Sequence, residues 1–232
     1  MLNELPKKEK VRKPDTKWRH FWRVQKVCLL RSVTPCMMYL FMSLIALALQ
    51  ALAADVEAYE VVLGSVCIAC GAAFNAHLAF NYGKMHFDSY LTGCLHRQNV
   101  RMGIVSGGDH RPEQEYRPWK GFLIGFYVGI PVLIFGTLAI FPATWDWAEV
   151  VLDMFAAWAI LPIQWYRGIV WAGTDDWAYP PVSGGWSLLL ILLPVIVTGV
   201  FYIVGAYAEK RKKEAESRRT EEVNSVMKGK KK

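Results

Sequence analysis

Four stretches of about 20 residues with almost no charge constrain this chain more than any other feature of its sequence. They lie at about residues 33–54, 59–80, 119–141 and 186–208. A helix needs about 20 apolar residues to cross the ~30 Å hydrocarbon core of a bilayer. A helix on the surface of a soluble protein keeps a polar face, which these stretches lack. The sequence therefore predicts an all-α integral membrane protein with four transmembrane helices.

Lys and Arg are concentrated in three pieces of the chain. Residues 1–32, 81–120 and 209–232 hold 26 of the 27 basic residues. The charged residues of 55–60 and 142–185 are all acidic except Arg167. Segments rich in Lys and Arg stay on the cytoplasmic side of a membrane. This distribution predicts that both termini are cytoplasmic, which requires an even number of crossings. The net charge of +7 is thereby explained by topology and by anionic lipid, so we expect no nucleic-acid partner.

The predicted organisation has three parts. Residues 1–32 form a basic cytoplasmic tail, 33–208 the transmembrane bundle and 209–232 a second basic cytoplasmic tail. Within the bundle we expect a cytoplasmic loop at 81–118 and an external cap at 142–185. The short extramembrane segments and Lys-rich tails favour a bacterial cytoplasmic membrane as the location.

A fifth apolar stretch, Trp147–Ala172, complicates this topology, because a fifth crossing would place the basic C-terminal tail outside. Pro162 interrupts the stretch, and its polar residues fall within an arc of about 60° on a helix. They are Glu149, Asp153, Gln164 and Arg167. A helix polar on one side favours an interfacial or re-entrant element in the outer leaflet, and a true crossing is the alternative. These residues, with His77 and Asn81 at one end of the second span, are also a candidate polar pathway, unless they simply face water.

Both tails contain a helical pattern. Before the first span, Trp18 and Trp22 recur at helical spacing, and Arg19, Arg23 and Lys26 point mostly to other sides. This pattern predicts a basic amphipathic helix that lies on anionic lipid. The C-terminal tail alternates Lys or Arg with Glu, which predicts a helical extension of the last span. A further short amphipathic helix is predicted over about 84–102.

Small residues mark two packing faces. Gly121, Gly125 and Gly129 recur every fourth residue in the third window, which lets another helix approach closely. We expect this face to contact another span, a partner subunit or a second copy of the chain. In the second window, small residues again lie on one face: Gly64, Cys67 and Gly71. Cys67 and Cys70 form a Cys-x-x-Cys pair, for which we favour packing over redox or metal chemistry.

Four residues of the cytoplasmic loop are candidate metal ligands: His86, His96, Asp109 and His110. His is the commonest metal ligand, but none of the spacings matches a ligand motif, and His86 and His96 would not converge on one helix. We therefore expect neither a metal nor another cofactor.

Three classes of function are compatible with this pattern. The first is a non-enzymatic subunit or scaffold of a membrane assembly, which we favour. The second is a small transporter or channel component that uses the polar pathway residues. The third is a membrane enzyme or metal-binding protein with a site on its His-rich cytoplasmic face. We assign no catalytic residue, because the sequence contains no nucleophile–base pair and no phosphate-binding loop that matches a known motif.

Overall fold

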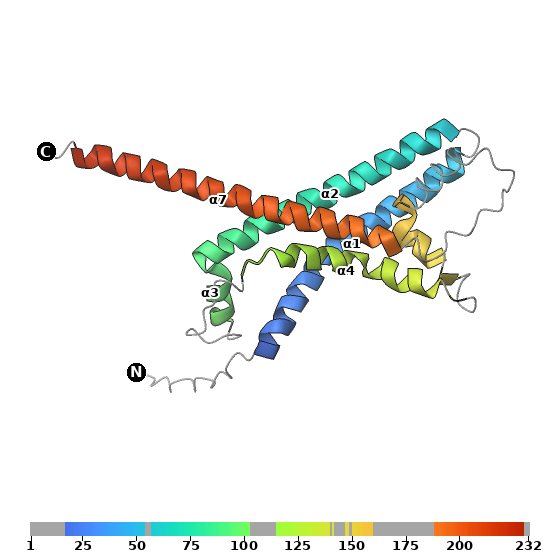
Figure 1. Ribbon diagram of the computed structural model, residues 1–232, viewed down its shortest axis with the longest axis horizontal. Helices are drawn as coiled ribbons and strands as arrows, with labels where there is room; N and C mark the ends of the chain where they lie inside the picture. The colour runs from blue at the N-terminus through green and yellow to red at the C-terminus, as the bar shows by residue number, and fades with distance from the viewer. Residues whose placement is uncertain are drawn as a thin grey trace, which may run out of the picture.

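The computed structural model describes most of the chain as helix (Figure 1). The described residues are 17–53, 57–102, 115–139, 141, 147–148, 150–159 and 188–229. The helices are α1 (Lys17–Ala53), α2 (Glu57–Thr92), α3 (Cys94–Arg101), α4 (Trp119–Leu138), the 3-10 helix η2 (Leu188–Ile191) and α7 (Leu192–Gly229). A shorter apolar helix covers Val150–Ala159.

Four helices are long and apolar enough to cross a membrane: Lys17–Leu49, Val62–Thr92, Trp119–Leu138 and Leu189–Ser225. The prediction of four long apolar helices in an all-helical chain is therefore confirmed. This places the protein among candidate multi-pass membrane proteins by the length and hydropathy of its helices.

Two helix boundaries differ from the sequence prediction. The amphipathic segment around Trp18 is not a separate helix, because α1 continues without a break for 37 residues, or about 55 Å. Pro35 lies inside this helix and does not end it. The helix predicted over 84–102 is instead the end of α2 followed by α3. Gly93 separates the two with a φ of 62°, a left-handed conformation that glycine adopts without strain.

The α7 helix lies against both α2 and α4 (Figure 1). The backbones of α7 and α2 are in direct contact where the two helices cross, because each helix has a glycine at the contact. A Cβ atom on Gly83 would lie 2.0 Å from the carbonyl oxygen of Tyr202, and one on Gly205 would lie 2.1 Å from that of Phe80. Only glycine is compatible with this crossing.

The glycine motif of α4 packs against the same helix. A Cβ atom on Gly121 would lie 2.6 Å from Cβ of Tyr202, and one on Gly125 would lie 2.6 Å from the carbonyl oxygen of Pro194. At Gly129 the nearest atom would be Cγ2 of Ile191, at 2.7 Å. The chain's own α7 and η2 therefore cover the face that we expected to serve another span or a partner.

The small residues of α2 also lie inside the bundle. Cys67 packs with Ala46 of α1, Gly71 lies against the ring of Tyr39, and Gly64 is buried. Cys70 is exposed, so the two thiols of the Cys-x-x-Cys pair have different surroundings.

The short helix Val150–Ala159 inserts one side into the bundle. Leu152 and Ala156 pack with Val132 of α4 and with Ile191. A helix of ten residues covers only about 15 Å, half the thickness of the hydrocarbon core. The described part of the predicted external cap is thus too short to cross alone, and its inner side is buried rather than facing water. Residues 160–187, including Pro162, lie outside the described part of the chain.

Candidate functional site

An inner polar cluster joins three long helices. The side-chain amide of Asn75 on α2 donates to the hydroxyl of Tyr39 on α1 and to that of Thr198 on α7, each at 3.0 Å. Asn75 and Thr198 are each 1% exposed. Hydrogen bonds between helices in an apolar environment fix their relative positions, although each contributes only about 0.6 kcal/mol on average in a membrane protein.

Trp158 attaches the short helix to this cluster. Its ring stacks on Tyr39 with the centroids 4.4 Å apart, and its backbone N–H donates to the hydroxyl of Ser43 at 3.4 Å. The short helix is therefore held against α1 by an aromatic contact and a hydrogen bond.

A second group of contacts, here called the end cluster, lies at the end of the bundle where α3 and the start of α4 meet α2 and α7. His86 Nδ1 and the hydroxyl of Tyr202 lie 2.8 Å apart, and their side chains are 2% and 0% exposed. The ring of Tyr116 stacks on Tyr202 at 5.7 Å. These contacts satisfy a buried imidazole and a buried phenol together, which removes the cost of burying either alone.

The segment before α4 completes the end cluster. A carboxylate oxygen of Glu115 accepts from the backbone N–H of His96 on α3 at 3.0 Å. The ammonium of Lys120 donates to the backbone carbonyl of Glu115 at 2.9 Å. Both charged side chains are buried. The carboxylate of Glu115 therefore joins the segment before α4 to α3, and Lys120 joins the start of α4 to that segment.

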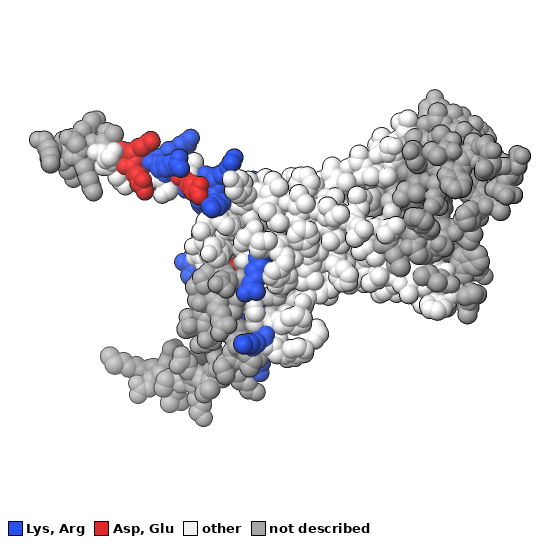
Figure 2. Space-filling model, in the orientation of Figure 1, with Lys and Arg blue, Asp and Glu red and all other residues white. Residues whose placement is uncertain are grey.

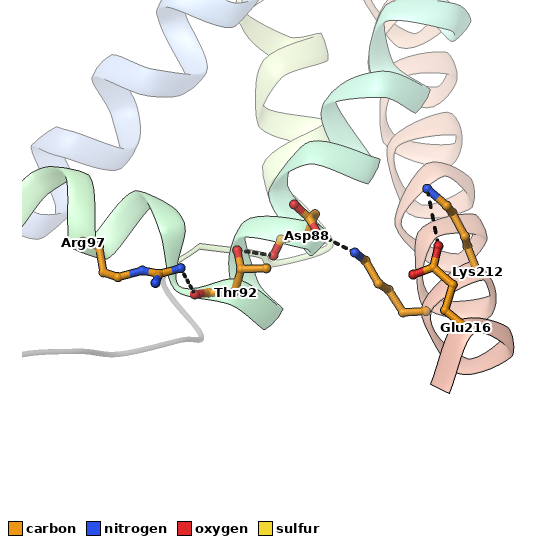
Figure 3. Close-up of polar contacts among 6 residues, drawn as sticks. Asp88, Thr92, Arg97, Lys212 and Glu216 are labelled. Carbon is orange, nitrogen blue, oxygen red and sulfur yellow. Dashed lines mark hydrogen bonds and ion pairs between the residues drawn. The ribbon is translucent and has the colours of Figure 1, made fainter. Parts of the chain in front are cut away.

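Charged and polar contacts at the surface of this end of the bundle are here called the rim (Figure 3). Lys213 of α7 lies 3.2 Å from a carboxylate oxygen of Asp88 on α2. On the far side of Gly93, the guanidinium of Arg97 donates to the backbone carbonyl of Thr92 at 2.9 Å. The rim connects α2, α3 and α7 at the surface.

Of the four candidate metal ligands, the two that the structure describes take part in hydrogen bonds within the chain. His86 is bonded to Tyr202, and the backbone of His96 is bonded to Glu115. Asp109 and His110 lie outside the described residues. Within the part of the chain that the structure describes, no group of three or more His, Cys, Asp or Glu could hold a metal ion.

The structure describes three of the six residues of the candidate polar pathway. Asp153 is half-buried on the short helix, whereas Glu149, Gln164 and Arg167 lie outside the described residues. His77 and Asn81 form a hydrogen-bonded pair of 3.0 Å on the exposed side of α2. His77 and Asn81 lie two and six residues after Asn75 on α2, and both are exposed whereas Asn75 is buried.

The predicted lipid anchors remain on the surface of α1. Trp18 and Trp22 are 66% and 56% exposed. Arg19 and Lys26 are exposed and Arg23 is half-buried. The arrangement suits contact with a surface outside the chain.

A small cavity lies between α1, α4 and the short helix. Tyr39, Val128 and Trp158 are among the residues that line it, and its volume is about 20 Å³. That space holds about one water molecule. It is therefore a packing defect beside the inner cluster rather than a substrate site.

Several residues of the inner cluster and the end cluster were not predicted from the sequence. Tyr39, Thr198 and Tyr202 carry polar groups within apolar windows. Burying a polar group in lipid is costly, so each is a usable indication of an interhelical contact. Glu115 and Lys120 carried no comparable indication, because charged residues in or beside a loop are common.

Neither the sequence nor the fold resembles a known protein closely enough to identify a relative. No protein-family model matches the chain, and neither a curated protein nor a solved structure matches it. The function must therefore be inferred from the arrangement of the residues themselves.

Proposed function

We propose that this protein is a non-enzymatic, multi-pass subunit of a membrane assembly that presents the C-terminal part of α7 to another protein. The observation that carries the proposal is the length of α7. This helix has 38 residues, or about 57 Å, whereas a bilayer core requires about 30 Å. The remainder, Lys210–Gly229, is here called the arm.

The arm extends away from the bundle (Figure 1). Glu209, at 8% exposure, is the last buried residue before it. Beyond that point the described side chains are exposed except for Lys213, which is half-buried beside Asp88. A helix without a buried face serves no packing role inside this chain, which supports a role in contacts with other molecules.

Alternating charges support the helical form of the arm. Lys210 lies 3.9 Å from Glu214, and Lys212 lies 3.9 Å from Glu216. Pairs at this spacing stabilise an isolated helix by only about 0.2–0.5 kcal/mol each. The arm alone is thus marginal as a helix, and a bound partner would stabilise it further.

The interior of the bundle supports a structural role over catalysis. The hydrogen bonds of Asn75 and His86 run to side chains on neighbouring helices and join α1, α2 and α7. Catalytic groups need access to a substrate, whereas these side chains are almost fully buried.

The proposed orientation places both tails and the α2–α4 connection in the cytoplasm. Lys and Arg are absent from Val33 to Gly83 and from Gly121 to Glu209 except at Arg167. In Figure 2 the coloured charged side chains gather at one end of the molecule and on the arm, while the visible surface of the bundle is uncharged. This segregation supports the orientation, because basic segments remain on the cytoplasmic side.

Purification of the full chain in mild detergent, with identification of co-purifying proteins, tests the function. We expect a stoichiometric partner that is lost when residues 214–232 are deleted. A matched variant with Glu214 and Glu216 changed to Gln keeps the arm and measures the contribution of its charges. A lone stable oligomer for both the full chain and the deletion would contradict the proposal and favour a transporter.

A reporter active only in the cytoplasm, fused to the C-terminus, tests the orientation.

A further inference from the structure

The N-terminal end of α1, Lys17–Lys26, carries an exposed cluster of aromatic rings and is here called the foot. The rings of Trp18, Phe21 and Trp22 contact one another, with centroids 5.7–5.9 Å apart. They are 66%, 46% and 56% exposed. Three neighbouring aromatic side chains on one surface indicate an interaction site, because this much apolar area is costly to leave in water.

The foot also carries only positive charge. Lys17, Arg19 and Lys26 are exposed and Arg23 is half-buried. The whole of α1 contains no Asp or Glu. The foot is therefore complementary to a surface that is both negatively charged and able to accept aromatic rings.

The position of the foot matches the headgroup region of a bilayer. In Figure 1 the N-terminal part of α1 projects from the bundle at the end where α3 lies. Val27, Leu29 and Leu30 follow the foot and are exposed apolar residues. They connect it directly to the membrane-crossing part of the helix. Trp rings concentrate at this level, because the ring is half-buried while its N–H stays hydrated.

We propose that the foot is a docking site for anionic phospholipid headgroups, and that it makes the protein select anionic over zwitterionic lipid. Arg19, Arg23 and Lys26 bind the phosphate layer, and Trp18 and Trp22 insert at the boundary with the acyl chains. Each Lys or Arg near an anionic membrane surface strengthens binding about fivefold. A bilayer provides both the anionic phosphates and an apolar layer beneath them, whereas an acidic protein would need a separate apolar patch for the three exposed rings.

The arm provides a matched control within the same chain. It is also basic on balance, but its charges alternate in sign and residues 210–232 contain no aromatic side chain. If net charge alone determined lipid selection, neutralising the arm and neutralising the foot would have equal effects. The proposal requires them to differ.

The test uses full-length protein purified in detergent and equilibrated with equal amounts of phosphatidylglycerol and phosphatidylcholine. Native mass spectrometry then measures the ratio of the two lipids retained. We expect the foot variant with Arg19, Arg23 and Lys26 changed to Gln to reduce the ratio at least about tenfold. The arm variant with Lys210, Arg211 and Lys212 changed to Gln should change it less than about twofold.

A second measurement separates loss of the site from loss of the fold. The double variant with Trp18 and Trp22 changed to Phe keeps the basic residues and aromatic surface but removes both indoles. Quenching of Trp fluorescence by brominated phosphatidylglycerol should then fall relative to the wild-type chain, while the melting temperature is unchanged. Equal lipid ratios in the foot and arm variants, or undiminished quenching in the double variant, would overturn the proposal. So would a foot variant that keeps its lipids but loses a bound acidic protein.

Discussion

The first and last helices are nearly equal in length, at 37 and 38 residues, yet they are fixed in the bundle by different means. The α7 helix is held through its backbone, because Gly83 of α2 and Gly125 of α4 remove the side chains that would separate the helices. The α1 helix is held through side chains, chiefly the hydrogen bond and ring stacking of Tyr39. Backbone contact tolerates almost no added volume, whereas side-chain contact can be weakened in small steps.

The parts of these helices beyond the bundle differ as well. The foot of α1 exposes aromatic rings among basic residues, and the arm of α7 exposes charges of both signs with no aromatic ring. One surface matches a lipid headgroup layer, and the other matches water or a protein. The side chains of the foot and the arm are therefore the basis of the different uses that we propose for them.

The strongest test of the backbone contact is Gly83→Leu, with Gly205→Leu as the reciprocal change. Either side chain would collide with a backbone carbonyl at about 2 Å, which cannot move aside as a side chain could. We expect a destabilisation beyond the ~1–3 kcal/mol of an overpacked core, seen as a large fall in melting temperature in detergent. The control is Ala73→Leu on the exposed side of α2, which should melt near the wild-type temperature. Equal melting of all three variants would remove the distinction between α1 and α7.

A smaller but still large effect is expected for Gly125→Leu on the other side of α7. The added side chain meets the backbone of Pro194 and Val195, each at 2.6 Å from the position of Cβ. The α4–α7 contact should open, lowering the melting temperature and the recovery of folded protein. Phe126→Leu at the neighbouring exposed position serves as the control. An unchanged melting temperature for Gly125→Leu would show that this face is not tightly packed.

Tyr39→Phe should have a moderate effect, because it removes one hydrogen bond and keeps the ring stacked on Trp158. The loss of the bond from Asn75 is expected to cost about 0.5–1.5 kcal/mol, and Thr198 remains as a partner for Asn75. Thermal unfolding monitored by circular dichroism measures this change. A loss as large as that of Gly83→Leu would mean that α1 is fixed as rigidly as α7.

The smallest effect is expected at the base of the arm, for Lys213→Gln. Its contact with Asp88 at 3.2 Å lies at the surface, where water and salt weaken ion pairs. The melting temperature should change by no more than about 2–4 °C. A shift of many degrees that disappears at high salt would instead assign the pair a role in holding α7.

The sequence predicted the long helices well because hydrophobic length is a local property. It also located the α4 contact, since Gly121, Gly125 and Gly129 repeat within one window. It did not predict the crossing of α2 and α7, because Gly83 and Gly205 are 122 positions apart and neither belongs to a repeat. The bond between His86 and Tyr202 was missed for the same reason: only the crossing brings the two side chains together.

The close seating of α7 has a mechanical consequence. The helix runs without interruption from Leu192, next to the apolar contacts of Ile191 with the short helix, to Gly229 at the end of the arm. Because its backbone rests directly on two other helices, α7 has little freedom to tilt or shift independently of them. Once a bound partner stabilises the arm as a helix, a load applied to it would therefore reach the opposite end of α7 as a movement of the whole helix, rather than being absorbed by side chains between α7 and its neighbours.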